Sequence, residues 1–155
     1  MAIRKSAGIL LYKRAVGGIS VLLAHPGGPF WAKRDLGAWS IPKGEYGDDE
    51  QPEAAARREF AEELGLDFHG ALQPLGEVRQ KGGKLVIAFA SEADFEVAGL
   101  RSNLFEMEWP PGSGRRQSFP EVDRAEWFLL PAARQKINAG QRPLLDRLEA
   151  ISTAG

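Results

Sequence analysis

The segment between Pro52 and Gly65 is the feature that most constrains the fold of this chain. Pro52 suits the first turn of a helix, where its missing N–H leaves no hydrogen bond unmade, and Gly65 is a natural C-terminal stop. The residues between them are strong helix formers. Ala56, Phe60 and Leu64 follow one another at intervals of four and share one side, so we predict a helix with that side buried.

Segments rich in aliphatic residues lie on both sides of this helix in the sequence. Residues 6–13 and 19–25 predict a β-hairpin, because the glycines between them permit a tight turn. Residues 72–80 and 84–91 predict a second pair of strands. Strands, hairpins and helices interleave irregularly, so we expect an α/β sandwich on a mixed β-sheet. The length favours one domain, residues 1–155.

Other parts of the chain carry weaker signals. The content of Pro, Gly and Ser predicts long loops at residues 25–39 and 95–120. The remaining predictions are a short extended piece at 40–42, a polar loop at 44–51, a strand at 125–130, a helical segment at 131–139, and a C-terminal helix with Leu144, Leu145 and Leu148 inward.

Charge is unevenly distributed along the chain. The formal net charge of −1 gives no argument for binding nucleic acid or an anionic membrane. Residues 44–66, however, hold eight acids and two bases, a net charge of −6, which leaves +5 on the remainder. An acidic centre in a mildly basic body suits a cation that bridges to an anionic ligand, although a solvated acidic helix would give the same pattern.

The chain contains no cysteine, which excludes disulfides, thiolate metal sites and cysteine nucleophiles. This composition fits a reducing compartment, and we expect a cytoplasmic protein. The apolar run at residues 7–12 is too short for a signal peptide, and no segment approaches membrane-spanning length. We therefore expect no membrane partner.

Three glutamates share a narrow stripe of the predicted helix. At about 100° per residue, Glu62 and Glu63 lie about 60° and 40° to either side of Glu59. Like charges at this spacing repel each other. Mg²⁺ prefers oxygen ligands and joins a few carboxylates to substrate phosphates. Two interpretations follow: a divalent-ion site for phosphate chemistry, or a solvated acidic face paired with nearby basic residues.

A longer motif contains this stripe. From Gly44 the chain reads GEYGDDEQPEAAARREFAEELGL, in which five residues separate Gly44 from Glu50 and seven more precede Arg58-Glu59. Every position matches the signature box of the Nudix hydrolases, and the chain resembles this MutT-like family. The resemblance implies an α/β/α sandwich that hydrolyses a P–O–P bond in a nucleoside diphosphate derivative, with Mg²⁺ or Mn²⁺ as the cofactor.

The resemblance also implies roles for residues of the box. Glu59, Glu62 and Glu63 would hold the metal, and the backbone carbonyl of Gly44 would add a ligand. Arg58 would orient the carboxylates. One carboxylate must accept a proton from the attacking water, and we expect Glu59 or Glu63 in that role.

Two further carboxylates complete the expected site. Glu50 would pair across the loop and the helix. Relatives also use a carboxylate from a loop outside the box, and the segment FPEVDRAEWF offers Glu121 at a similar place. We expect Glu121 to be a further metal ligand or base, or else an exposed glutamate at a strand edge.

Substrate contacts are expected from three basic residues. Lys43 stands immediately before the box and could touch a distal phosphate. Its PKG context resembles the branch of the family that hydrolyses dinucleoside polyphosphates. Arg115 and Arg116 could clamp the phosphates of a long substrate, unless they belong to a solvated loop.

Aromatic and histidine side chains give less definite expectations. Trp31, Trp39 and Trp109 could stack on a base or belong to the core. We expect His25 and His69 to be ordinary surface residues.

We therefore expect a pyrophosphohydrolase whose partner is a small-molecule nucleotide and not a nucleic acid. The best substrate hypothesis is a dinucleoside polyphosphate such as diadenosine tetraphosphate. Alternatives are a nucleoside triphosphate pyrophosphohydrolase that sanitises the nucleotide pool, or a non-catalytic module that binds a nucleotide. The sequence leaves the oligomeric state open.

Overall fold

The computed structural model describes residues 3–154, so Met1, Ala2 and Gly155 of the expected domain lie outside the described residues. Helices and strands alternate irregularly along the chain. The strands are β1 (Lys5–Ala15), β2 (Gly18–Pro26), β3 (Lys43–Glu45), β4 (Gln73–Arg79), β5 (Leu85–Glu92), β6 (Leu104–Glu108), β7 (Arg116–Pro120) and β8 (Val122–Leu129); the helices are α1 (Pro52–Leu64), α2 (Leu130–Lys136) and α3 (Arg142–Ala154), with short 3₁₀ turns at Val97–Gly99 and Ala139–Gln141.

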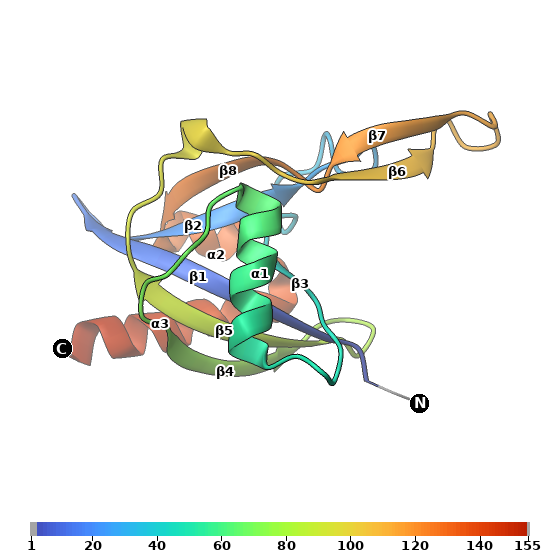
Figure 1. Cartoon of the computed structure of the whole chain (residues 1–155). Helices are drawn as coiled ribbons and strands as arrows, with labels where there is room; N and C mark the ends of the chain where they lie inside the picture. The colour runs from blue at the N-terminus through green and yellow to red at the C-terminus, as the bar shows by residue number, and fades with distance from the viewer. Residues whose placement is uncertain (1–2, 155) are drawn as a thin grey trace.

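A mixed six-stranded sheet forms the middle layer, with strand order β4-β5-β1-β2-β8 and β3 paired to β1. β1 and β5 run parallel, and the other pairs are antiparallel. α1 covers one face of the sheet, and α2 and α3 cover the other (Figure 1). The expected α/β/α sandwich on a mixed sheet is confirmed.

The helix predicted from Pro52 and Gly65 is α1. Ala56, Phe60 and Leu64 are fully buried against the sheet, as expected. Gly65 ends the helix with φ of 78°, a left-handed conformation that glycine adopts without strain. The C-terminal helix is confirmed as well, and its three leucines are buried. No helix within residues 3–154 is long and apolar enough to cross a membrane.

β3 was not predicted, because residues 44–51 resemble a polar loop. One edge of β1 pairs with β5, while the other edge is shared: β2 pairs with its second half and β3 with Ser6, Ala7 and Gly8. β3 therefore completes an edge that β2 leaves open. Residues 43–45 are held in place by this pairing, directly before the loop that leads to α1.

The prediction of a loop over residues 95–120 is wrong in its second half. β6 and β7 form an antiparallel hairpin of their own, and this arm (residues 104–120) stands out from the body of the molecule (Figure 1). Phe105 lies opposite Phe119 across the hairpin, and their ring centroids are 6.0 Å apart. The glycine- and proline-rich stretch is only the turn at its tip.

The prediction that His25 is a surface residue is wrong, since its side chain is fully buried. Its Nδ1 lies 2.8 Å from a carboxylate oxygen of Asp123, and its Nε2 lies 2.7 Å from the carbonyl oxygen of Arg34. The ring packs edge-on against the buried Trp39 at 5.0 Å. His25 thus ties the loop after β2 to the sheet, whereas His69 is exposed as expected.

Candidate active site

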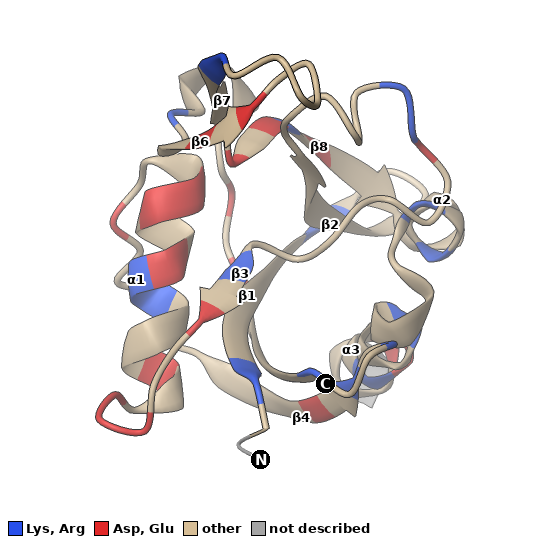
Figure 2. Ribbon diagram, turned by 90° about the vertical axis from the view of Figure 1, so that its right-hand side faces the viewer, with Lys and Arg blue, Asp and Glu red and all other residues tan. Residues whose placement is uncertain are grey.

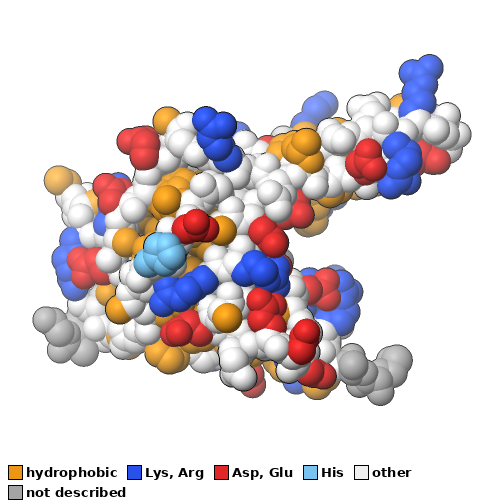
Figure 3. Space-filling model, viewed as in Figure 1, with side chains coloured by type: hydrophobic (Ala, Val, Ile, Leu, Met, Phe, Trp, Pro, Cys, Tyr) orange, Lys and Arg blue, Asp and Glu red, His pale blue; other side chains and the backbone are white. Residues whose placement is uncertain are grey.

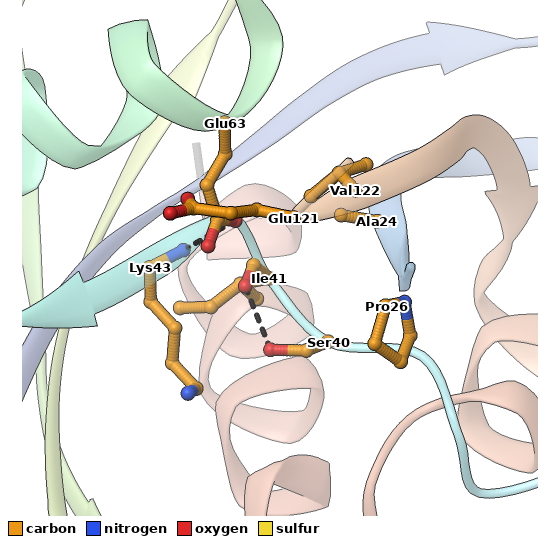
Figure 4. A pocket seen from close by; sticks show the side chains of 8 residues that line it. All are labelled: Ala24, Pro26, Ser40, Ile41, Lys43, Glu63, Glu121 and Val122. Carbon is orange, nitrogen blue, oxygen red and sulfur yellow. Dashed lines mark hydrogen bonds between the residues drawn. The ribbon is translucent and has the colours of Figure 1, made fainter. Parts of the chain in front are cut away.

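A pocket of about 120 Å³ opens where four segments of the chain meet (Figure 4). The end of β2 forms one wall, and the segment that leads into β3 forms the next. The C-terminal turn of α1 and the start of β8 close it. The lining residues are Ala24, Pro26, Ser40, Ile41, Lys43, Glu63, Glu121 and Val122.

Glu63 reaches this pocket from the last turn of α1. Its carboxylate accepts a hydrogen bond of 3.2 Å from the backbone N–H of Lys43. Burial raises the pKa of Glu63 to about 8, and the negative charges of Glu121 and Glu59 contribute to this rise. A negative charge on Glu63 is therefore unfavourable here unless the carboxylate binds a proton or a cation.

Glu59 is 8% exposed and lies one turn earlier on the same helix. Its carboxylate packs directly over Gly44, so closely that a β-carbon on residue 44 would overlap the carboxylate atoms. Gly44 pairs with Ala7, whose side chain belongs to the core beneath α1. Paired residues point to the same face of a sheet, so a side chain on residue 44 would also point toward α1. Only glycine therefore fits at the first position of the motif.

Arg58 connects three carboxylates of the motif. Its Nε and Nη2 donate hydrogen bonds of 2.8 Å to the two carboxylate oxygens of Glu50. Its Nη1 donates to Glu59 at 2.8 Å and to Glu62 at 3.2 Å. The planar guanidinium fixes these carboxylates relative to one another.

Glu121 stands between the arm and β8. Its backbone N–H donates to the carbonyl of Asn103 and its carbonyl accepts from the N–H of Gly27, which fixes the main chain at this point. The carboxylate points toward Glu63 in Figure 4, and within residues 3–154 it has no hydrogen bond or ion pair. Burial and then Glu62 raise its pKa. The structure therefore brings Glu121 to the carboxylates of α1.

Lys43 shares the pocket, but its side chain leads away from the carboxylates (Figure 4). It lies opposite Gly8, on the face of the sheet that α2 and α3 cover. Burial and the nearby ammonium of Lys84 lower its pKa. Lys84, which the sequence did not single out, has Glu45 as its nearest acid at 3.9 Å.

Arg115 and Arg116 are not brought to the pocket. Both are exposed on the arm, and Arg116 lies 4.0 Å from Glu106 on the neighbouring strand. Their contact with substrate stays a prediction.

The carboxylates suit a hard divalent cation by their chemistry. Figure 2 shows acidic residues gathered along α1 and the loop before it. Burial raises the pKa of Glu59, and Glu62 and Glu121 oppose its ionisation further. Within the described residues no three such side chains form a ready-made metal cluster, since Arg58 holds Glu59 and Glu62. The fit rests on the oxygen donors themselves and on Glu63 and Glu121, whose carboxylates form no ion pair within residues 3–154.

Comparisons with known proteins indicate a family and a fold. The NUDIX domain profile matches residues 2–148. An RNA pyrophosphohydrolase from Marinomonas sp. is 40% identical over 60 residues, which cover 38% of this chain and 37% of that protein. The aligned part thus spans well under half of this relative.

Solved structures resemble this chain over nearly all of its length. A C. elegans Ap4A hydrolase, solved as a binary complex, has a TM-score of 0.66 at 22% identity. The alignment covers 99% of this chain and 100% of the hydrolase chain. The NUDIX domain of Shewanella oneidensis NrtR, complexed with ADP ribose, has a TM-score of 0.67 at 15% identity. The alignment covers 98% of this chain and 90% of the NrtR chain. At these identities the likeness concerns the fold.

Proposed function

The chain belongs to the NUDIX family, and we propose from this premise that residues 1–155 act as one domain that hydrolyses a P–O–P bond in a nucleoside diphosphate derivative with the help of a divalent metal. One observation carries the proposal. Glu63 on α1 and Glu121, between β7 and β8, line one pocket, Glu59 lies one turn earlier on α1, and burial together with neighbouring carboxylates raises the pKa of all three.

Glu59, Glu62 and Glu63, with the carbonyl of Gly44, would hold Mg²⁺ or Mn²⁺. Held there, the cation would supply charge neutralisation on the phosphate oxygens and would lower the pKa of a nearby water. Arg58 keeps Glu59 and Glu62 oriented through its hydrogen bonds to both, and Glu50 holds the guanidinium in place.

Glu121 is the base that we favour, with Glu63 and Glu59 as the alternatives. Its carboxylate faces the pocket without a hydrogen-bond partner in the described residues, so its lone pairs are available to take the proton of the attacking water. Its main chain is fixed on both sides by hydrogen bonds, which holds the carboxylate at the pocket rim.

A dinucleoside polyphosphate such as diadenosine tetraphosphate is the substrate that we propose. The fold agrees over the whole chain with a C. elegans Ap4A hydrolase.

The 5′-phosphate end of RNA is a second candidate, because the curated relative is an RNA pyrophosphohydrolase. The two candidate substrates differ in what lies beyond the phosphates: a single nucleoside in the dinucleotide, and an oligonucleotide in RNA.

A substrate panel tests the proposal. Diadenosine tetraphosphate, nucleoside triphosphates and 5′-triphosphorylated RNA are incubated with Mg²⁺ or Mn²⁺, and the products are identified by chromatography. We expect the dinucleotide to be cut at the highest kcat/KM. Cleavage of triphosphates alone would refute the dinucleotide, and an inert protein would refute hydrolysis itself.

A further inference from the structure

Large hydrophobic side chains lie exposed on the loop after β2 and on the arm. Phe30 is 60% exposed, and the partly buried Trp109 meets it from the arm. Their ring centroids are 5.4 Å apart and the ring planes are almost perpendicular. Two segments far apart in the sequence thus meet in one aromatic surface, in which Phe30 is exposed and Trp109 is partly buried.

This surface is part of a fixed framework. The N–H of Gly27 donates to the carbonyl of Glu121 at 3.0 Å. Gly28, with φ of 96°, lets the loop approach the ring of Phe105 so closely that a β-carbon would lie 2.9 Å from its Cζ. The loop and the arm therefore keep Phe30 and Trp109 in fixed positions relative to each other.

The aromatic surface lies close to the candidate active site. Pro26 lines the pocket and Phe30 follows four residues later, so their Cα atoms are at most about 14 Å apart. Glu121 lies at the foot of the arm and contributes to the same pocket. The space-filling view shows the arm standing out over a hollow, with hydrophobic side chains on its lower side (Figure 3).

Basic residues neighbour these rings along the chain. Lys33 and Arg34 follow Phe30 in the same loop, and the carbonyl of Arg115 accepts a hydrogen bond of 2.9 Å from the N–H of Trp109. Within residues 3–154, none of these three basic side chains forms an ion pair. The guanidinium of Arg34 lies 5.7 Å from the ring of Trp31, which is also exposed. Aromatic faces bordered by unpaired cations suit a nucleobase attached to phosphates better than an apolar peptide.

We propose that Phe30 and Trp109 form a stacking site for the base of the distal nucleoside of a dinucleoside polyphosphate, whose phosphates lie in the carboxylate pocket. This inference rests on the proposed function, because it assigns the part of the substrate that extends beyond the cleaved bond. It makes the two aromatic residues determinants of specificity for a substrate with two nucleosides. Trp39, by contrast, belongs to the core.

Equilibrium binding tests the site without turnover. The wild type, Phe30→Ala and Trp109→Ala are titrated calorimetrically with diadenosine tetraphosphate and with adenosine tetraphosphate in buffer that contains EDTA. We expect each alanine to weaken binding of the dinucleotide about 5- to 150-fold, the range that base–aromatic stacking provides. Binding of adenosine tetraphosphate, which lacks the second nucleoside, should change less than twofold.

Two variants control for general damage. Leu36→Ala removes another exposed hydrophobic side chain from the same loop and should bind both ligands like the wild type. Phe30→Tyr keeps the ring and should restore dinucleotide binding. Equal losses for both ligands, unchanged dinucleotide binding in the alanine variants, or a wild type that does not bind the dinucleotide would each overturn the inference. Hydrolysis with Mg²⁺, measured separately, tests the proposed function.

Discussion

Replacing Gly44 with alanine tests whether the close approach of Glu59 to the main chain is needed for catalysis. Residue 44 does not have the positive φ that disfavours alanine, so the backbone tolerates the change. The added β-carbon, however, would overlap the carboxylate of Glu59. The carboxylate must move away, and its 2.8 Å hydrogen bond from Arg58 must stretch or break.

The size of the effect follows from how Glu59 is held. The side chain is almost buried, so an overpacked site should cost about 1–3 kcal/mol of stability. For a protein of this size that lowers Tm by about 2–12 °C. A shift of about 1 Å in a group that positions the reacting atoms can cost about 100-fold in rate. We therefore expect kcat/KM to fall about 100-fold in Gly44→Ala.

The assay is hydrolysis of diadenosine tetraphosphate with Mg²⁺, alongside thermal unfolding. Gly47→Ala is the matched control, because a β-carbon there meets only the carboxylate end of the flexible Asp49 side chain, at 3.0 Å. This control should keep its activity within about twofold of wild type. A Gly44→Ala protein with wild-type kcat/KM would refute the reasoning, whatever its Tm.

Three further predictions concern the framework and the charges of the site. Arg58→Lys loses the planar fork that holds Glu50 on one side and Glu59 on the other, so kcat/KM should fall about 10- to 100-fold while circular dichroism stays unchanged; activity near that of wild type would contradict this role. His25→Ala leaves a cavity and two unpaired partners and should lower the free energy of unfolding by about 2–5 kcal/mol in urea, whereas exposed His69→Ala should change it by less than about 0.5 kcal/mol. Because the pKa of Glu63 is raised to about 8 in the metal-free protein, this carboxyl holds a proton at pH 7 that a cation must displace. Affinity for Mg²⁺ should thus rise from pH 6 to pH 8, with proton release seen by calorimetry in buffers of different ionisation enthalpy; an affinity independent of pH would contradict it.

Local signals in the sequence were sufficient for the central helix. Pro52 and Gly65 mark its ends because proline and glycine act on the backbone of their own segment, and the buried face follows from helical spacing. The same holds for the position of Arg58 beside three glutamates. These features need no knowledge of distant parts of the chain.

Features that depend on distant partners were missed. The burial of His25 depends on Asp123, which lies 98 residues away, and no pattern near His25 in the sequence indicates that burial. β3 exists only because β1 has an open edge. The arm could have been found, since Phe105 and Met107 alternate with Glu106 and Glu108, but the turn residues after them dominated the prediction.

The site itself was predicted in part. Glu121 was suggested through the resemblance and lies at the pocket, although its chemical role stays a prediction. Arg115 and Arg116 were grouped with the phosphates on charge alone, and the structure places them on the arm. Lys43 was expected to touch a distal phosphate, which stays a prediction, and strand alternation turns its side chain to the opposite face of the sheet from Gly44.

The most direct test of the central claim compares wild type with Glu63→Gln for hydrolysis of diadenosine tetraphosphate, with and without Mg²⁺. The amide keeps the shape of Glu63 but cannot carry the negative charge that binds a cation. The account predicts Mg²⁺-dependent cleavage by wild type and a loss of about 1,000-fold or more in the variant, which should unfold at a similar temperature. A variant that hydrolyses the substrate at the wild-type rate, or a wild type that needs no metal, would contradict it.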